Sequence, residues 1–232
     1  MRTLLALILL LLLLAIALSL PVVQTRLGHY VTERINNDYG TDITVGRVAL
    51  TAFGGVRFRE VMIRDHHRDT LIYAKRIHTN ILSFKRLYGG DLLFGDIRTN
   101  NIFLKIKIYK GETDSSLDRF VALFDSGKPS AKPFLLEAKT VAVEGGRFAM
   151  YDYNLPQPKN LEVFALNANL RKLRLYGPDI TMGIEKMSFM HHRGLEVRNL
   201  VADFTYTKKN ILLKKLDLQT AFSTLQGDVA LH

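Results

Sequence analysis

Two pairs of adjacent histidines are the residues whose type first suggests chemistry. His66-His67 and His191-His192 each stand near an expected turn. Imidazole nitrogens are common metal ligands. Neighbouring residues of a strand point to opposite faces, however, so neither pair alone is expected to hold one ion easily. We therefore predict solvated loop histidines and no metal site.

Two short motifs match catalytic signatures only in part. Leu123 to Gly127 reads Leu-Phe-Asp-Ser-Gly, as at the start of an aspartic-protease lobe. That chemistry needs a second aspartate to share the proton, and the sequence has no second copy of the motif. Gly127-Lys128 precedes Pro129 and lacks the Ser/Thr and the earlier glycine of a phosphate-binding loop. We predict no catalytic residues, no cofactor and no enzyme activity.

The charge of the chain is basic but dispersed. The formal net charge is +10, and lysines such as Lys105 and Lys107 occupy outward positions of an expected strand. A nucleic-acid surface needs basic residues and stacking aromatics on one face, so we predict no nucleic-acid partner. Attraction of Arg26, Arg34 and Arg47 to anionic lipid stays open beside a simply solvated surface. Without cysteine, disulfides and thiolate chemistry are excluded.

An uncharged, leucine-rich segment at the N-terminus determines where the rest of the chain lies relative to a membrane. Leu4 to Val23 contains no charged residue, and twenty helical residues span roughly 30 Å, the thickness of a hydrocarbon core. The segment predicts a transmembrane anchor over residues 1–23, with the N-terminus and Arg2 inside. A cleaved secretory signal is the alternative, with small residues around Ala15 to Ser19 for cleavage. In either interpretation, the rest of the chain is exported across the membrane.

The remaining sequence indicates a mainly β fold with short helices. A short amphipathic helix is expected over residues 24–40, because Leu27, Val31 and Ile35 recur every four positions before Gly40. A first β segment is expected over 41–109. In it, alternation jumps by one residue at Glu60-Val61, as in a β-bulge.

The clearest strand covers residues 102–109, where apolar residues alternate with Lys105 and Lys107. The connection 110–134 contains a helical pattern near 116–124, which we expect to cover an end or edge of the sheet. A second β segment follows over 135–232, with strands at 138–144, 147–153, 161–176, 180–190, 195–206, 210–220 and 224–231. Glycine pairs at 54–55, 89–90 and 145–146 are expected to form turns.

Three segments form a loose repeat. Residues 56–65, 97–106 and 141–152 each combine alternating residues with a polar or glycine-containing break. Weakly similar serial strands are typical of a sheet that can be extended. Because the last residues resemble a strand interior, we expect a longer protein that continues this sheet beyond residue 232.

The first 110 residues resemble the AsmA-like family, and most closely the N-terminal region of its TamB-type (translocation and assembly module) members from Bacteroidetes-like bacteria. The leucine-rich anchor is followed in order by the segments 26–31, 41–48, 54–58, 61–65 and 69–74, and 134–153 is similar to the next strand group of the family. The order and spacing of these segments carry the resemblance.

This resemblance implies a single-pass inner-membrane protein with its bulk in the periplasm. The implied fold is an elongated, curved β-sheet trough that is apolar inside, and the implied partners are phospholipid acyl chains, the inner membrane and an outer-membrane barrel protein. The implied function is a bridge for phospholipid transport; a scaffold for outer-membrane protein assembly is the alternative. The candidate groove-lining residues alternate along strands: Ile102, Leu104, Ile106, Ile108, Val141, Val143, Leu173 and Leu175.

Overall fold

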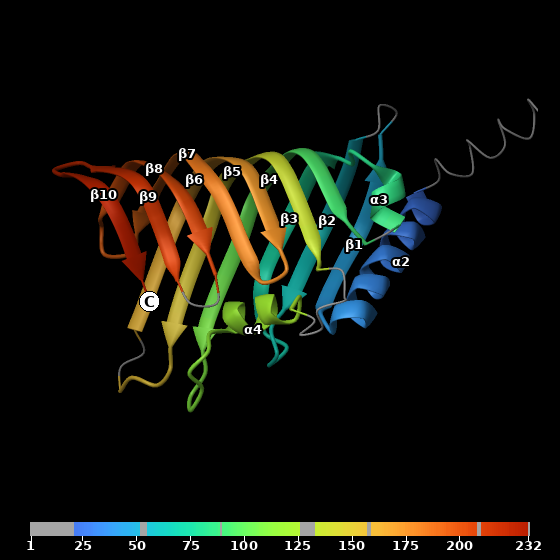
Figure 1. The fold of residues 1–232 in the computed structure, drawn as a ribbon, viewed down its shortest axis with the longest axis horizontal. Coiled ribbons are helices and arrows are strands. Elements are labelled where there is room, and N and C mark those ends of the chain that lie inside the picture. The colour runs from blue at the N-terminus through green and yellow to red at the C-terminus, as the bar shows by residue number, and fades with distance from the viewer. Residues whose placement is uncertain are drawn as a thin grey trace, which may run out of the picture.

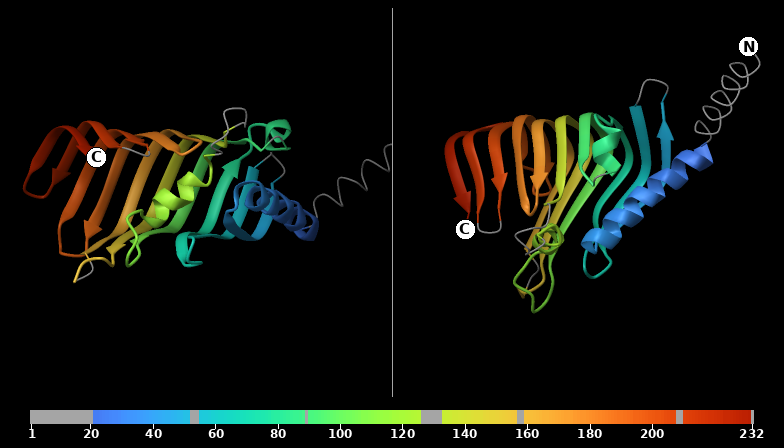
Figure 2. Two further views of the ribbon diagram at one scale, coloured as in Figure 1. Left: turned by 60° about the horizontal axis from the view of Figure 1, so that its bottom comes forward. Right: turned by 45° about the vertical axis from the view of Figure 1, so that its right-hand side comes forward.

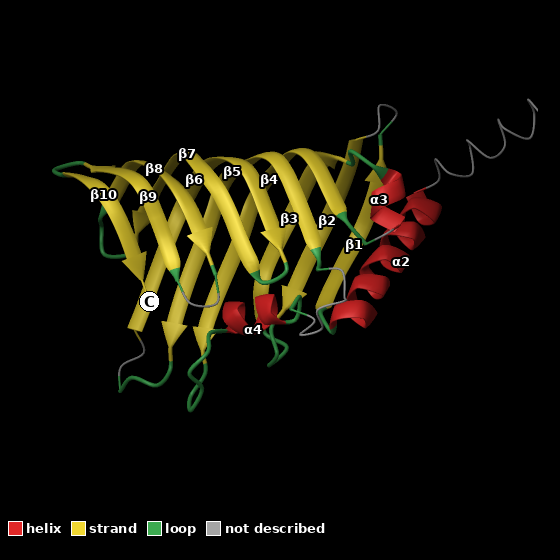
Figure 3. Cartoon of the chain, in the orientation of Figure 1, coloured by secondary structure: helices red, strands yellow, loops and turns green. Residues whose placement is uncertain are grey.

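The computed structural model describes residues 21–51, 55–88, 90–125, 133–156, 159–207 and 210–231. In this part of the chain ten strands form one open mixed sheet, accompanied by helices (Figures 1 and 3). The strands are β1 (Asp42–Leu50), β2 (Gly55–Arg64), β3 (Thr70–Asn80), β4 (Leu92–Ile108), β5 (Leu135–Asp152), β6 (Lys159–Tyr176), β7 (Asp179–His191), β8 (Glu196–Tyr206), β9 (Ile211–Thr220) and β10 (Thr224–Leu231). The helices are α2 (Pro21–Tyr39), α3 (Phe84–Tyr88) and α4 (Ser116–Ala122). The mainly β class is confirmed.

The strands lie in the sheet in the order in which they occur in the chain. Each neighbouring pair is antiparallel except β4 and β5, which are parallel. Parallel neighbours need a crossover connection, and residues 109–134, which carry α4, supply it. The two β segments expected at 41–109 and 135–232 are therefore halves of one sheet, joined edge to edge at β4 and β5.

The expected amphipathic helix corresponds to α2, which ends before Gly40. Gly40 has φ of 71° and its N–H donates to the carbonyl oxygen of Asn36 at 2.7 Å, as a helix C-terminus requires. Residues 1–20 of the expected anchor lie outside the described residues. Among the helices that are described, none combines the length and the apolar character needed to cross a membrane.

Left-handed backbone residues of β2, β4 and β5 lie in one row across the sheet, which passes through Lys75 of β3. Glu60, Asn101 and Gly145 have φ of 54°, 55° and 63°. The registers of their neighbours place Glu60 opposite Lys75, Lys75 opposite Asn101, and Asn101 opposite Gly145. A non-glycine residue in this conformation costs roughly 1–2 kcal/mol. We call these four aligned positions the crease.

The crease keeps apolar side chains on one face of the sheet. Ile97 and Ile102 of β4 belong to one hydrophobic cluster, although residues an odd number apart point to opposite faces in a regular strand. The left-handed residue between them, Asn101, resets the alternation. At Glu60 the pairing with β1 and β3 continues without an extra residue, so the expected β-bulge at this position is wrong and a register-preserving kink takes its place.

The crease also explains the loose repeat. Val56 pairs with Thr79, Thr79 lies in the row of Ile97, and Ile97 pairs with Val141, so the three repeated segments are aligned across the sheet. Their breaks fall at the crease. Gly145 and Gly146 accordingly lie inside the continuous strand β5, not in a turn between two strands as expected.

The sheet is strongly curved. Leu92 and Leu104 of β4 both pack against one hydrophobic cluster, although twelve residues of straight strand would separate them by roughly 40 Å. Figures 1 and 2 show the strands bending so that the two sides of the sheet face each other, with α4 on the concave side. We call the face that holds this cluster the concave face.

Helix α2 covers the free edge of β1. The Asn36 side chain accepts a hydrogen bond from the Ile43 N–H and donates one to the Ile43 carbonyl oxygen, both at 2.9 Å. Farther along, the Thr25 hydroxyl donates to the Val48 carbonyl oxygen at 3.3 Å. Gly28 allows the close approach, because a Cβ there would overlap the Val48 side chain. The polar groups of this edge are thus occupied by a helix.

Candidate functional site

A hydrophobic cluster on the concave face joins α4 to both sides of the sheet. Its buried members come from β3, α4, the segment before β5 and the end of β8. They are Leu71, Phe120, Val121, Phe124, Phe134 and Tyr206. Half-buried apolar residues of α2, α4 and eight strands, β2 to β9, pack around them. Most of the strand residues in this cluster lie within two residues of a strand end, so helix α4 lies on the concave face against an end of the sheet, as expected.

A capping box fixes the start of α4. The Ser115 hydroxyl accepts a hydrogen bond from the Asp118 N–H at 3.1 Å, and the Ser115 N–H donates to the Asp118 carboxylate at 2.9 Å. The next residue, Ser116, is fully buried, and its hydroxyl accepts from the Lys107 N–H at 2.9 Å. The helix is thereby attached to the end of β4.

A hydrogen bond also attaches α4 to the distant strand β8. The buried Tyr206 hydroxyl donates to the second oxygen of the Asp118 carboxylate. Burial first, and then this hydrogen bond, raise the pKa of Tyr206 well above its usual value. We call the Tyr206–Asp118 contact the latch, because it links α4 to the end of β8.

The other side of the concave face is built from strands alone. A cluster over β6 to β10 has a buried centre formed by Ile184, Ala202 and Leu216. Its half-buried margin contains Leu170, Met187, Leu200, Phe204, Leu213, Leu218 and Val229. Leu170 and Met187 also belong to the cluster of β4 to β7 that contains Ala138. The apolar face is consequently continuous from β4 to β10.

The structure places the eight predicted lining residues on the concave face. Leu104 and Leu175 pack in the cluster that α4 covers. Four others belong to the cluster around Ala138: Ile102, Val141, Val143 and Leu173. Ile106 and Ile108 share the face of Leu104, because β4 alternates regularly from Leu104 to Ile108. Sequence reasoning missed the concave-face residues of β7 to β10, where register shifts interrupt the alternation.

The opposite, convex face is polar at the same level of β4. Lys105 and Lys107 both reach the Asp69 carboxylate, Lys105 at 3.2 Å. Burial raises the pKa of Asp69, but the hydrogen bonds from Lys107, the Thr70 N–H and Lys105 outweigh it and lower the pKa to about 2. These lysines are therefore held in ion pairs that neutralise part of the basic surface.

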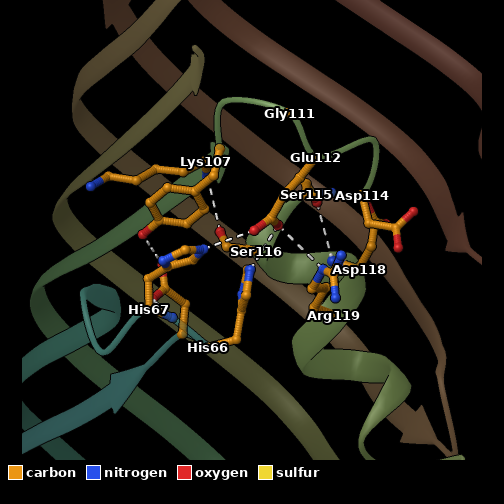
Figure 4. Close-up of polar contacts among 12 residues, drawn as sticks. His66, His67, Lys107, Gly111, Glu112, Asp114, Ser115, Ser116, Asp118 and Arg119 are labelled. Carbon is orange, nitrogen blue, oxygen red and sulfur yellow. Dashed lines mark hydrogen bonds and ion pairs between the residues drawn. The ribbon is translucent and has the colours of Figure 1, made fainter. Parts of the chain in front are cut away.

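His66 and His67 are exposed loop residues, as expected, but their side chains do not point to opposite sides. His66 and His67 lie in the turn between β2 and β3, where strand alternation does not apply, and their ring centroids are 4.5 Å apart. Both imidazoles reach the carboxylate of Glu112, each with Nε2 at 2.8 Å from one of its oxygens. His67, and then His66, hold the pKa of Glu112 below its usual value. Figure 4 shows this group beside the start of α4.

Comparison with known proteins gives no further guide to function. The chain matches no protein-family model, and no curated protein matches it.

Proposed function

We propose that the chain is a membrane-anchored, periplasmic segment of a lipid bridge, with a concave apolar face that carries phospholipid acyl chains between the inner and outer membranes. The continuity of that face from β4 to β10 is the observation that supports the proposal. An acyl chain leaving water for an apolar surface gains on the order of 0.8 kcal/mol per buried CH₂. Movement along such a face needs no catalytic group.

The dimensions of the helix-free part suit an acyl chain. The cluster from β6 to β10 extends over four strand spacings, or roughly 19 Å at about 4.8 Å each. One leaflet of a hydrocarbon core is about 15 Å thick, which is the space that one set of acyl chains fills. The margin of this cluster is half-buried, so apolar surface is accessible there. An apolar face distinguishes headgroups poorly, so broad lipid specificity is expected.

The positions of α2 and α4 support a proposal for which part of the concave face contacts lipid and which end of the sheet lies at the inner membrane. At β1 the edge is occupied by α2, and the cluster that contains α4 includes concave-face residues of β2 to β9. The neighbouring cluster around Ile184, over β6 to β10, contains strand residues only. We therefore propose that lipid contacts the face from β6 onward, and that the predicted anchor holds the α2 end at the inner membrane.

Site-specific photo-crosslinking in membranes tests this proposal. A crosslinking residue at Leu218, in the concave cluster of β9, should capture phospholipid. Its neighbour Gln219 is exposed and points to the opposite face, so a crosslinker there is the matched control and should capture little. A second matched pair is Leu213 with Lys214. Equal capture at both members of each pair would refute the proposal.

A second candidate function is a scaffold that pairs with strands of outer-membrane proteins. Among the described strands, β10 pairs only with β9, and seven of its eight residues are exposed. Phe222, at the tip of the β9–β10 hairpin, is 99% exposed. A strand that is paired on one side only among the described residues can accept an extended peptide by β-augmentation. Crosslinks from Gln226 to unfolded barrel proteins, without lipid capture at Leu218, would favour this function.

A further inference from the structure

Three side chains from two distant segments converge beside α4. One ring nitrogen each of His66 and His67 and one carboxylate oxygen of Glu112 all lie within 4.8 Å of one another. The histidines belong to the β2–β3 turn, and Glu112 lies three residues before the cap of α4. Figure 4 shows the carboxylate between the two imidazoles and the guanidinium of Arg119. Two imidazoles and one carboxylate form a donor set that Zn²⁺ prefers.

The β2–β3 turn holds the two imidazoles in place. The buried Asp65 carboxylate accepts hydrogen bonds from the N–H groups of His67 and Asp69, both at 2.9 Å. Its other oxygen accepts from the Tyr109 hydroxyl at 2.6 Å. The Tyr109 ring lies 3.9 Å from the His67 ring and meets the His66 ring edge-on at 5.5 Å. Such outer contacts are those that orient ligands in metal sites.

The backbone around Glu112 is fixed as well. Asn154 donates from Nδ2 to the Glu112 carbonyl oxygen at 2.8 Å, and its Oδ1 accepts from the Gly111 N–H at 2.7 Å. Gly111 has φ of 82°, a conformation that favours glycine. Both halves of the group are therefore held by contacts that do not depend on the histidine–glutamate hydrogen bonds.

We propose that His66, His67 and Glu112 form a binding site for a divalent transition-metal ion of the Zn²⁺ type, which fastens the β2–β3 turn to the connection that carries α4. Ligand atoms about 2.0–2.1 Å from a tetrahedral ion are roughly 3.3 Å apart. The His66 and His67 nitrogens lie 2.8 Å from different oxygens of the Glu112 carboxylate, and the three ligand atoms lie within 4.8 Å of one another, so side-chain adjustments of roughly 1.5 Å or less bring them to this spacing. Water completes the coordination.

Arg119 competes with the ion for the same carboxylate. Its Nε lies 3.3 Å from Glu112 Oε2, and its side chain is 45% exposed, so it can swing into solvent when the ion binds. Removing this positive charge should strengthen metal binding, because the cation no longer has to displace it. The direction of this effect distinguishes a metal site from a purely structural cluster of ion pairs.

Calorimetric titration of the full chain in detergent with ZnCl₂ alone, after chelator treatment, tests the site. One equivalent of Zn²⁺ should bind, and Mg²⁺ should not, because Mg²⁺ requires oxygen ligands. Glu112→Gln and His66→Ala should each weaken binding at least tenfold, and Arg119→Gln should tighten it at least threefold. Co²⁺ should show the visible absorption of a tetrahedral nitrogen and oxygen site in the unaltered chain.

The second histidine pair supplies the matched control. His191, the last residue of β7, and His192, in the turn that follows, are also adjacent, with ring centroids 4.3 Å apart, and they do not belong to the three-ligand group. The double variant His191→Ala, His192→Ala should bind Zn²⁺ as the unaltered chain does. Circular dichroism of the metal-free variants checks that they are folded. Absence of stoichiometric binding, or binding unchanged by Glu112→Gln, would overturn the proposal.

Discussion

Removing one hydroxyl group, in the variant Tyr206→Phe, should loosen α4 from the distant side of the sheet. Tyr206 is only 6% exposed, and its hydroxyl donates to the carboxylate of Asp118, 88 residues earlier in the chain. A hydrogen bond to a charged group contributes about 1.5–3 kcal/mol to stability. Asp118 is half-buried, so water can replace part of the contact. We therefore expect a loss of about 1.5 kcal/mol.

Urea unfolding of the variants measures this loss, as a lower midpoint at an unchanged m-value. The control Tyr176→Phe alters a tyrosine that is 42% exposed and should change stability by less than about 0.5 kcal/mol. Asp118→Asn and the double variant complete a double-mutant cycle, which separates the latch from the capping role of Asp118. A coupling energy of about 1 kcal/mol or more is expected.

The latch also predicts a dependence on alkaline pH. Because burial and the Asp118 hydrogen bond raise the pKa of Tyr206, the folded state favours the protonated phenol. The stabilisation is fully present below the unfolded-state pKa of about 10 and is lost as pH rises through the folded-state value. The stability difference between the unaltered chain and Tyr206→Phe should therefore shrink above about pH 10. A zero coupling energy at neutral pH would refute the proposed fastening of α4.

Three further predictions test the edge, the crease and a second tyrosine. Asn36→Ala removes both side-chain hydrogen bonds to Ile43 and should lower the free energy of unfolding by about 1–3 kcal/mol. It should also promote self-association, which size-exclusion chromatography detects. A monomer of unchanged stability would contradict the proposal that α2 caps the edge of β1. Asn101→Val places a branched side chain at φ of 55° and should cost at least ~1–2 kcal/mol in urea unfolding, whereas Asn101→Gly should be tolerated; equal stabilities would contradict the crease. The Glu162 hydrogen bond, and then burial, raise the pKa of Tyr151 to about 12, so the stabilising contribution of Tyr151 is complete below about pH 10 and is lost toward pH 12. The difference in tyrosinate absorbance between the unaltered chain and Tyr151→Phe should therefore titrate near pH 12. A titration near pH 10 would contradict this prediction.

The strands were predictable from sequence where their alternation is regular. Residues 102–108 alternate without a break, and the structure places Ile102 and Leu104 on the concave face as expected. The crease was visible only as an irregularity. A polar residue such as Glu60 or Asn101 between two alternating runs is consistent with a bulge, a turn or a left-handed kink. Only the pairing of the neighbouring strands decides between these.

Contacts between distant segments could not be predicted. The position of α4 depends on the parallel pairing of β4 with β5, which sets where the connection must return, and no short-range pattern encodes it. The histidine group has the same limitation. His67 and Glu112 are 45 residues apart, and the strand alternation expected to separate the two histidines does not hold in a turn. The available sequence signal for this group was Glu112, an acidic residue in a glycine-containing loop near the start of a predicted helix.

Quantifying the phospholipid that copurifies with the full chain tests the central claim most directly. Native mass spectrometry of the unaltered protein, released from detergent, should show bound phospholipid. Leu218→Glu places a charge in the concave cluster and should abolish this binding, whereas Gln219→Glu, on the opposite face, should retain it. A folded protein without lipid, or equal lipid on both variants, would contradict an acyl-chain-binding concave face.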